Sequence, residues 1–291
     1  MLKKQRGGIN NLIKWVYKNP FINYILLILL KVKIIKIFFS HLKQQYLKNK
    51  IFMIQGHKML MNNLELSINE NYDVTETEIV KREIKRGDVV LDIGANVGFY
   101  TLIFARLVGP KGKVFAFEPD PESFYLLKKN VEINGYTNVI LIQKAVSNSN
   151  GKLRLYLSEL NKGDHRIWDS WEKRNSIEIE SIRLDDYFKN YSEKISFIKI
   201  DTQGAEGLVF QGMSDLLKQS NNVIIILEFW PAGLKRTGMD PADFLKLISE
   251  HGFKLYQMKE KKNSLEIANI DELLKIVSIN NWCNLFLVKE K

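Results

Sequence analysis

The chain has 291 residues, of which 45% are hydrophobic and 11% aromatic, so it can bury a full core and is not a disordered protein. Its formal net charge is +10, but residues 1–64 hold twelve Lys or Arg and no acid, which leaves 31 bases against 33 acids in the rest. A basic groove for nucleic acid across the folded body is therefore not supported. The single cysteine, Cys283, excludes an internal disulfide and a multi-cysteine metal site, and a cytoplasmic location is expected.

The first fifty residues are basic and partly apolar. The longest uncharged run, Pro20 to Leu30, is too short to span a bilayer, which takes about 20 residues. Beyond it, Lys33, Lys36 and Lys43 recur at helical spacing among apolar residues, which predicts a basic amphipathic helix. Either this helix lies on the anionic inner face of a membrane, where each base contributes about 1 kcal/mol, or it packs on the body. We therefore expect a helical extension over residues 1–50 and one domain over residues 51–291.

The body shows the pattern of an α/β protein. Short apolar runs just after residue 50 predict a small β-hairpin ahead of the main sheet. The runs "VVLDIG", "KVFAFE", "VILIQ", "ISFIKID" and "NVIIILEF" then alternate with segments of helical spacing. Such strands, apolar on both faces, are typical of parallel sheets covered by crossover helices. We expect a doubly wound, Rossmann-like, mostly parallel sheet of seven strands, with "FKLYQM" and "NLFLVK" last and an inserted β-hairpin within residues 151–183.

The turn after the first strand of this sheet, in "LDIGANVGFY", indicates a ligand. Asp92 ends the strand, and Gly94, Asn96 and Gly98 follow on the turn, where glycine permits positive φ and close approach of the main chain. The turn lacks the Lys-Ser or Lys-Thr of a phosphate cradle and is not G-x-G-x-x-G. An acid at this place would repel a diphosphate but suits a cation. S-adenosylmethionine carries an ammonium and a sulfonium and no phosphate, so it is the cofactor that we expect.

The next two strands support a nucleoside ligand. Glu118 lies twenty residues after Gly98, where dinucleotide folds place the acid that accepts from ribose hydroxyls, and Pro119 follows it. Ala145 and Val146, after the third strand, are placed to flank an adenine ring.

Candidates for the chemistry follow the fourth strand. Period two puts Lys199 and Asp201 on one face, and Glu206 begins the next helix. We expect Asp201 to be an acceptor-site or general-base carboxylate and Glu206 a second carboxylate, with Lys199 holding either their charge or the acceptor oxygen. The alternative is structural: Glu206 stabilises a helix N-terminus and Lys199 pairs with Asp201.

Three further residues are candidates for acceptor binding or proton transfer. His165 lies in a polar loop of the insertion and titrates near neutrality, so it is a second candidate base. Glu228 either lines an acceptor pocket or caps its strand. Trp230 either stacks on a sugar face or is a packing residue. No metal site is predicted.

The chain resembles a known family in seven segments that occur in order. These segments are "LDIGANVGFYT", "FAFEPDP", "AVSNSNG", "GDHRI", "IRLDDYF", "FIKIDTQGAE" and "LEFWP". Together they are similar to the FkbM-like S-adenosylmethionine-dependent methyltransferases, over about residues 51–289. The resemblance implies O-methylation of a hydroxyl on a sugar, glycoconjugate or natural product, with a small-molecule or carbohydrate acceptor rather than nucleic acid. Two alternatives stay open: an NAD-dependent oxidoreductase of Rossmann type, and an inactive scaffold recruited to a membrane.

Overall fold

The computed structural model describes residues 50–61, 74–159, 161–169, 174–220, 222–259, 264–275 and 282–289, together with Asn19, Leu42 and Leu47. Nearly all of the extension over residues 1–50 lies outside this part of the chain, so its helix and its membrane contact stay predictions. Across the ranges described, no helix is long and apolar enough to cross a bilayer.

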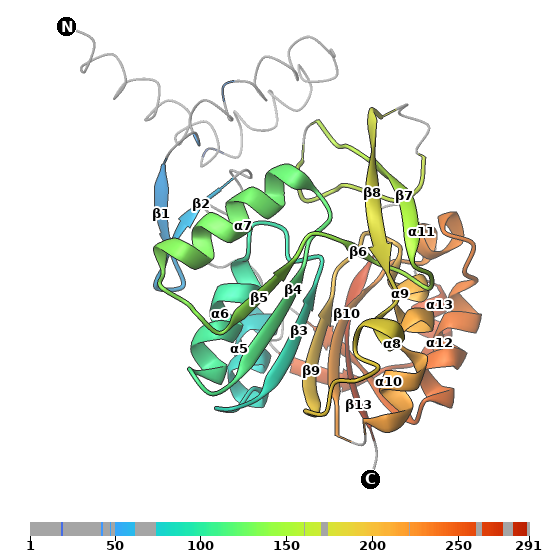
Figure 1. The fold of residues 1–291 in the computed structure, drawn as a ribbon. Helices are drawn as coiled ribbons and strands as arrows, with labels where there is room; N and C mark the ends of the chain where they lie inside the picture. The colour runs from blue at the N-terminus through green and yellow to red at the C-terminus, as the bar shows by residue number, and fades with distance from the viewer. Residues whose placement is uncertain are drawn as a thin grey trace, which may run out of the picture.

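The main sheet has eight strands in the order β12-β11-β13-β10-β9-β3-β4-β5 (Figure 1). Neighbours from β5 through β10 pair in parallel, whereas β13 pairs antiparallel with both β10 and β11. The strands are β3 (Val89–Ile93), β4 (Lys113–Phe117), β5 (Val139–Ile142), β9 (Ile195–Ile200), β10 (Ile224–Phe229), β11 (Phe253–Lys259), β12 (Ser264–Ile267) and β13 (Cys283–Lys289). Seven of these follow the predicted doubly wound pattern, and β12 adds a short antiparallel strand at one edge.

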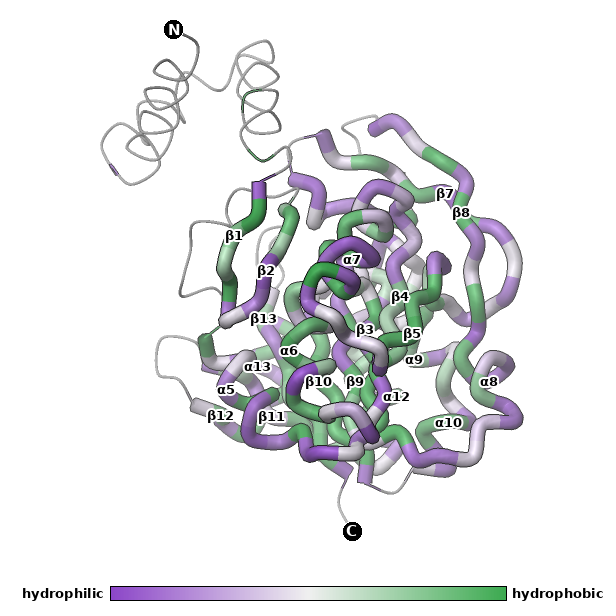
Figure 2. Tube along the Cα trace, turned by 60° about the vertical axis from the view of Figure 1, so that its left-hand side comes forward, coloured by the Kyte–Doolittle hydropathy of each residue, from purple (hydrophilic) through white to green (hydrophobic). Residues whose placement is uncertain are grey.

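Helices cover both faces of the sheet, and each face has its own apolar core. In β3, Leu91 and Ile93 pack in one cluster and Val90 in the other, as period two requires. The helices are α5 (Val74–Glu83), α6 (Phe99–Val108), α7 (Pro121–Ile133), α8 (Leu184–Tyr187), α9 (Glu206–Gly212), α10 (Ser214–Gln219), α11 (Pro231–Arg236), α12 (Pro241–Glu250) and α13 (Ile270–Leu274). Figure 2 shows the apolar residues concentrated in the central strands, with polar residues on the outer helices.

Two smaller sheets flank the main one. The predicted hairpin ahead of it forms from β1 (Ile51–Ile54) and β2 (His57–Leu60). The side chains of Asn130 in α7 and of Asn134, which caps that helix, accept from the backbone of β2. The predicted insertion is also confirmed. β7 (Gly151–Tyr156) and β8 (Ser176–Ile182) pair antiparallel, and β6 (Ala145–Val146) joins β8 to complete a three-stranded sheet. Figure 1 shows this hairpin rising beside the upper end of the main sheet.

Candidate functional site

A cavity lies where β3 and β4 end, beneath the loop that follows β7. The predicted cofactor residues in its wall are Gly94, Asn96, Glu118, Pro119, Ala145 and Val146. Asp201 and His165, two of the predicted catalytic residues, line the same cavity. Segments that are far apart in sequence therefore meet at the carboxyl ends of the strands, which is where open α/β sheets bind ligands.

The turn after β3 is held tightly on both sides. Gly94 has φ 83°, and a Cβ at this position would lie 1.9 Å from the carbonyl oxygen of Asp201. The backbone N–H groups of Gly94 and Ala95 both donate to the carbonyl of Phe117 at 3.0 Å. Asn96 has φ 50°, in the left-handed region that Asn tolerates. Only glycine fits at position 94, because β9 leaves no room for a side chain there.

Glu118 joins this turn to the start of α7. Its Oε2 accepts from the backbone N–H of Asn96 at 2.7 Å, and its Oε1 accepts from the N–H of Asp120 at 2.8 Å. Burial raises the pKa of Glu118 to about 8. When Glu118 is ionised, each carboxylate oxygen has two lone pairs and uses one of them, so the group can still accept from a ligand at the cavity wall. The predicted ribose acceptor is thus also a structural link between the two ligand-facing loops.

Asp92 and Gly98 lie behind the cavity wall rather than in it. The Asp92 carboxylate is 2% exposed and accepts from the Thr101 hydroxyl of α6 at 2.5 Å. Burial raises its pKa to about 6. Gly98 has φ 93°, and a Cβ there would lie 2.6 Å from the Leu127 side chain of α7. A protein hydroxyl therefore satisfies Asp92, and direct cofactor contact by either residue stays a prediction.

A buried ion cluster lies under Asp201. The Lys199 ammonium is 3.2 Å from the Asp201 carboxylate and 3.7 Å from that of Glu76, and it lies 4.7 Å from the ring centre of Tyr100. Burial opposes the charge of Asp201, but the Lys199 ammonium and a hydrogen bond from Gln203 outweigh it and hold the pKa of Asp201 below its usual range. Asp201 is therefore an ionised carboxylate at neutral pH.

Glu76 is a member of this cluster that sequence reasoning missed. It lies in the first turn of α5, is 4% exposed, and accepts from the Asn284 side chain at 3.1 Å. An acid in the first turn of a helix is ordinary, so the sequence gave no signal for a buried partner of Lys199.

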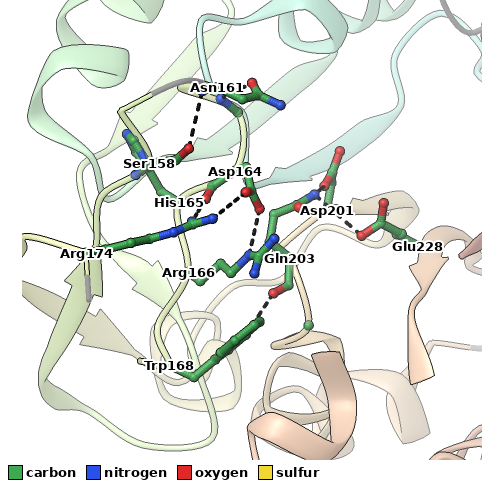
Figure 3. Close-up of polar contacts among 12 residues, drawn as sticks. Ser158, Asn161, Asp164, His165, Arg166, Trp168, Arg174, Asp201, Gln203 and Glu228 are labelled. Carbon is green, nitrogen blue, oxygen red and sulfur yellow. Dashed lines mark hydrogen bonds and ion pairs between the residues drawn. The ribbon is translucent and has the colours of Figure 1, made fainter. Parts of the chain in front are cut away.

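Gln203 lies between two carboxyl groups (Figure 3). Its amide nitrogen donates to Asp201 at 3.0 Å and is 3.4 Å from Glu228. Burial, with the charge of Asp201 next in weight, raises the pKa of Glu228 well above its ordinary value. Two carboxyl groups whose pKa values are shifted in opposite directions thus flank one amide at the ends of β9 and β10.

Glu206 is positioned to hold its own turn. Its Oε1 accepts from the backbone N–H and hydroxyl of Thr202, at 2.9 and 3.0 Å, and from the N–H of Gly204 at 3.2 Å. The side chain is fully buried outside the cavity wall, and burial raises its pKa to about 7. This geometry favours the structural alternative for Glu206.

His165 faces the cavity as a hydrogen-bond donor. Its Nδ1 accepts from the backbone N–H of Ser158 at 3.0 Å, and its Nε2 lies 3.9 Å from the Asp120 carboxylate. Burial lowers the pKa of His165, so its ring is neutral. Because Nδ1 accepts a hydrogen bond, the ring proton lies on Nε2. This arrangement leaves no free ring nitrogen to accept a proton and makes His165 a poor general base.

The loop that contains His165 has two faces. Gly163, His165 and Ile167 line the cavity. Trp168 turns to the other side, where its indole N–H donates to the carbonyl of Gln203 at 3.2 Å (Figure 3) and its ring lies 5.8 Å from that of Trp230. The insertion therefore covers the cavity with one face and forms an aromatic cluster beside the carboxyl pair with the other.

No group of three or more His, Cys, Asp or Glu side chains that could hold a metal ion occurs in the described part of the chain.

Comparison with known proteins gives a consistent set of relatives. A family model described as the methyltransferase FkbM domain matches residues 92–255, and one for protein-L-isoaspartate(D-aspartate) O-methyltransferase matches residues 33–147. The hexuronic acid methyltransferase AglP of Haloferax volcanii is 30% identical over 174 residues, which cover 59% of this chain and 66% of AglP. The 2-O-methyltransferase NoeI of Sinorhizobium fredii is 31% identical over 160 residues, which cover 49% of this chain and 64% of NoeI. The chain thus spans slightly less than two thirds of either relative.

Among solved structures, the methyltransferase FkbM from Methylobacillus flagellatus aligns with a TM-score of 0.42 at 11% identity. The alignment covers 78% of this chain and 52% of that protein.

Proposed function

This chain belongs to the FkbM methyltransferase family, and we propose that it transfers a methyl group from S-adenosylmethionine to a hydroxyl group of a sugar, glycoconjugate or related natural product. The observation that carries the proposal is the cavity at the ends of β3 and β4, which Gly94, Asn96, Glu118 and Asp201 line together. The family match favours methyl transfer over NAD-dependent oxidation, and an intact cavity argues against an inactive scaffold.

The residues in the cavity wall fit an S-adenosyl ligand. Glu118 keeps acceptor capacity toward the cavity, as a ribose diol requires. The side-chain oxygen of Asn96 is buried and has no hydrogen-bond partner among the described residues, so a donor from a ligand would satisfy it. Gly94 lets the main chain approach the ligand without a side chain between them. We therefore assign Glu118 to the ribose, and Ala145 and Val146 to the adenine.

A sugar hydroxyl is the acceptor that the relatives' names support. AglP is a hexuronic acid methyltransferase and NoeI a 2-O-methyltransferase. Trp168 is half-buried beside Gln203 and supplies indole surface of the kind that lies against sugar rings, whereas Trp230 is buried at 6% exposure, which favours its packing alternative.

The cofactor supplies an electrophilic methyl group on a sulfonium. The protein must hold the acceptor oxygen in line with that group and accept the hydroxyl proton as the new C–O bond forms. Asp201 is ionised, lines the cavity and is fixed by Lys199 and Gln203. We assign it to orient the acceptor hydroxyl and accept its proton, with Lys199 keeping it charged.

Incubation of the full chain with S-adenosylmethionine and a panel of sugar acceptors tests the proposal. Mass spectrometry should find a product 14 daltons heavier together with S-adenosylhomocysteine, and Asp201→Asn should lower kcat by about a hundredfold. When the gene is deleted, a glycan or lipid of the host should become 14 daltons lighter, because it lacks the methyl group. No difference in the host, with no methylated sugar in vitro, would reject a carbohydrate acceptor.

A further inference from the structure

Beside the carboxyl pair, two arginines and two tryptophans pack against one another. The guanidinium of Arg166 lies 4.7 Å from the ring centre of Trp168 and 4.8 Å from that of Trp230. The guanidinium of Arg236, at the end of α11, lies 5.8 Å from the Trp168 ring. We call these four residues the Arg–Trp ladder. Stacking on an indole holds a guanidinium in place while leaving its N–H edges available.

The acid in contact with this ladder is shared between two bases. Asp164 accepts from Nε of Arg166 at 2.6 Å and from a terminal nitrogen of Arg174 at 2.7 Å (Figure 3). Its backbone carbonyl also accepts from Arg174. One carboxylate therefore serves two guanidinium groups, and the terminal nitrogens of Arg166 make no hydrogen bond to another described residue.

Arg236 is the more exposed of the ladder's two cations. In the described ranges no acid forms an ion pair with it, and neither ladder arginine is paired with Asp169, the exposed residue after Trp168. Arg166 and Arg236 thus have one described acid between them, Asp164, although residues 65–291 together carry a net negative charge. Cationic groups held close together without enough acids to neutralise them point to an anionic ligand.

The position of the ladder connects it to the acceptor. Trp168 donates to the carbonyl of Gln203, whose amide joins Asp201 to Glu228. The loop that carries Arg166 also lines the cofactor cavity through His165. A molecule on the ladder would therefore lie next to Gln203 and the carboxyl pair that it joins, on the side of the loop opposite His165.

We propose that the acceptor is an anionic carbohydrate, and that Arg236 and the free edge of Arg166 bind its carboxylate or phosphate group while Trp168 packs against the sugar. This rests on the proposed function, since it assigns the substrate class of the same site. Arginine forks match both carboxylate and phosphate oxygens in paired hydrogen bonds, so the ladder chemistry alone does not separate a uronate from a sugar phosphate.

Binding to the full-length protein saturated with S-adenosylhomocysteine tests this, with three probes that differ in one group. These are methyl glucuronoside, methyl glucoside 6-phosphate and methyl glucoside, and indole fluorescence reports their binding. At least one anionic probe should bind ten or more times tighter than the neutral glucoside, and the tighter of the two identifies carboxylate or phosphate. The preference should weaken as salt is raised.

Variants separate the ladder from general charge. Arg236→Gln should lower the affinity for the anionic probe about tenfold to a hundredfold, which is the effect of losing a charge-assisted hydrogen bond. Arg236→Lys should lower this affinity less. Lys235→Ala removes an equal charge from an exposed neighbour on α11 and should change nothing. Equal binding of neutral and anionic probes, no binding of either anion, or equal effects of Arg236→Gln and Lys235→Ala would overturn the inference. If the unmodified protein does not bind S-adenosylhomocysteine, that result would instead count against the proposed function.

Discussion

The carbonyl oxygen of Asp201 occupies the space that a side chain at Gly94 would need, since a Cβ there would lie only 1.9 Å from it. The ligand turn after β3 and the proposed catalytic residue at the end of β9 are therefore in backbone contact. The hydrogen bond from the Asp201 N–H to the Ile93 carbonyl at 2.9 Å continues the same contact. A shift of one strand end must move the other.

Gly94→Ala should consequently damage both stability and ligand binding. We expect a larger fall in Tm than for Gly135→Ala, together with at least a tenfold loss of S-adenosylhomocysteine affinity by calorimetry. Gly135 is a matched control because it also has positive φ, at 71°, but nothing lies within 4 Å of a Cβ there. In Gly135→Ala the free energy of unfolding should fall only by the cost of backbone strain, about 1–2 kcal/mol. Equal effects of the two substitutions would contradict the proposed contact.

Glu118→Gln should weaken S-adenosylhomocysteine binding by about tenfold to a hundredfold. Both carboxylate oxygens accept from backbone N–H groups, of Asn96 and Asp120, so an amide NH₂ at either place would set donor against donor. Calorimetric titration measures the loss. Glu132→Gln, on the exposed side of α7, is the control and should bind as the unmodified chain does. An unchanged affinity for Glu118→Gln would remove this residue from the ribose assignment.

Buried acids should make the unliganded protein less stable as the pH rises. The folded pKa values of Asp92, Glu206 and Glu118 are raised to about 6, 7 and 8 by burial, above those of the unfolded chain. Between about pH 4.5 and 8 the folded form then binds more protons, so the contribution of these acids is fully present below this range and is lost across it. Urea denaturation at pH 5.5 and pH 8 should show lower stability at the higher pH.

The same experiment on Glu118→Gln should give a shallower pH dependence, because the group with the highest pKa no longer titrates. A slope equal to that of the unmodified protein would show that other groups cause the change.

Lys199→Met should destabilise the fold by about 3 kcal/mol, because it leaves the buried carboxylate of Glu76 without its ammonium neighbour. It should also raise the pKa of Asp201, since the Lys199 ammonium lowers it. Denaturant unfolding gives the first effect and the pH dependence of kcat the second. Lys113→Met removes an exposed cation paired with Glu193 and should cost less than 1 kcal/mol. Similar losses for both variants would contradict a buried cluster.

Residues that lie on a regular pattern were predictable from the sequence. Period two placed Lys199 and Asp201 on one face, and spacing from Gly98 identified Glu118 as the acid of the second strand. The insertion was visible as alternating runs between strands that are otherwise continuously apolar. In each case the signal is local, and the parallel sheet brings the local signals together.

The remaining contacts depend on tertiary packing. Glu76 meets Asn284, 208 positions away, and Gln203 bridges two carboxyl groups from a left-handed turn conformation that glutamine seldom adopts. Asp92 lies in the expected strand, but packing turns its carboxylate to the α6 hydroxyl of Thr101. No spacing rule indicates which way a side chain at a strand end turns.

The assignment of the cavity to S-adenosylmethionine can be tested by calorimetric titration of the full chain with S-adenosylhomocysteine, with NADH and the Glu118→Ala variant for comparison. We expect one ligand bound per chain, no heat with NADH, and loss of binding in the variant. Binding of NADH in place of S-adenosylhomocysteine, or undiminished binding by Glu118→Ala, would contradict it.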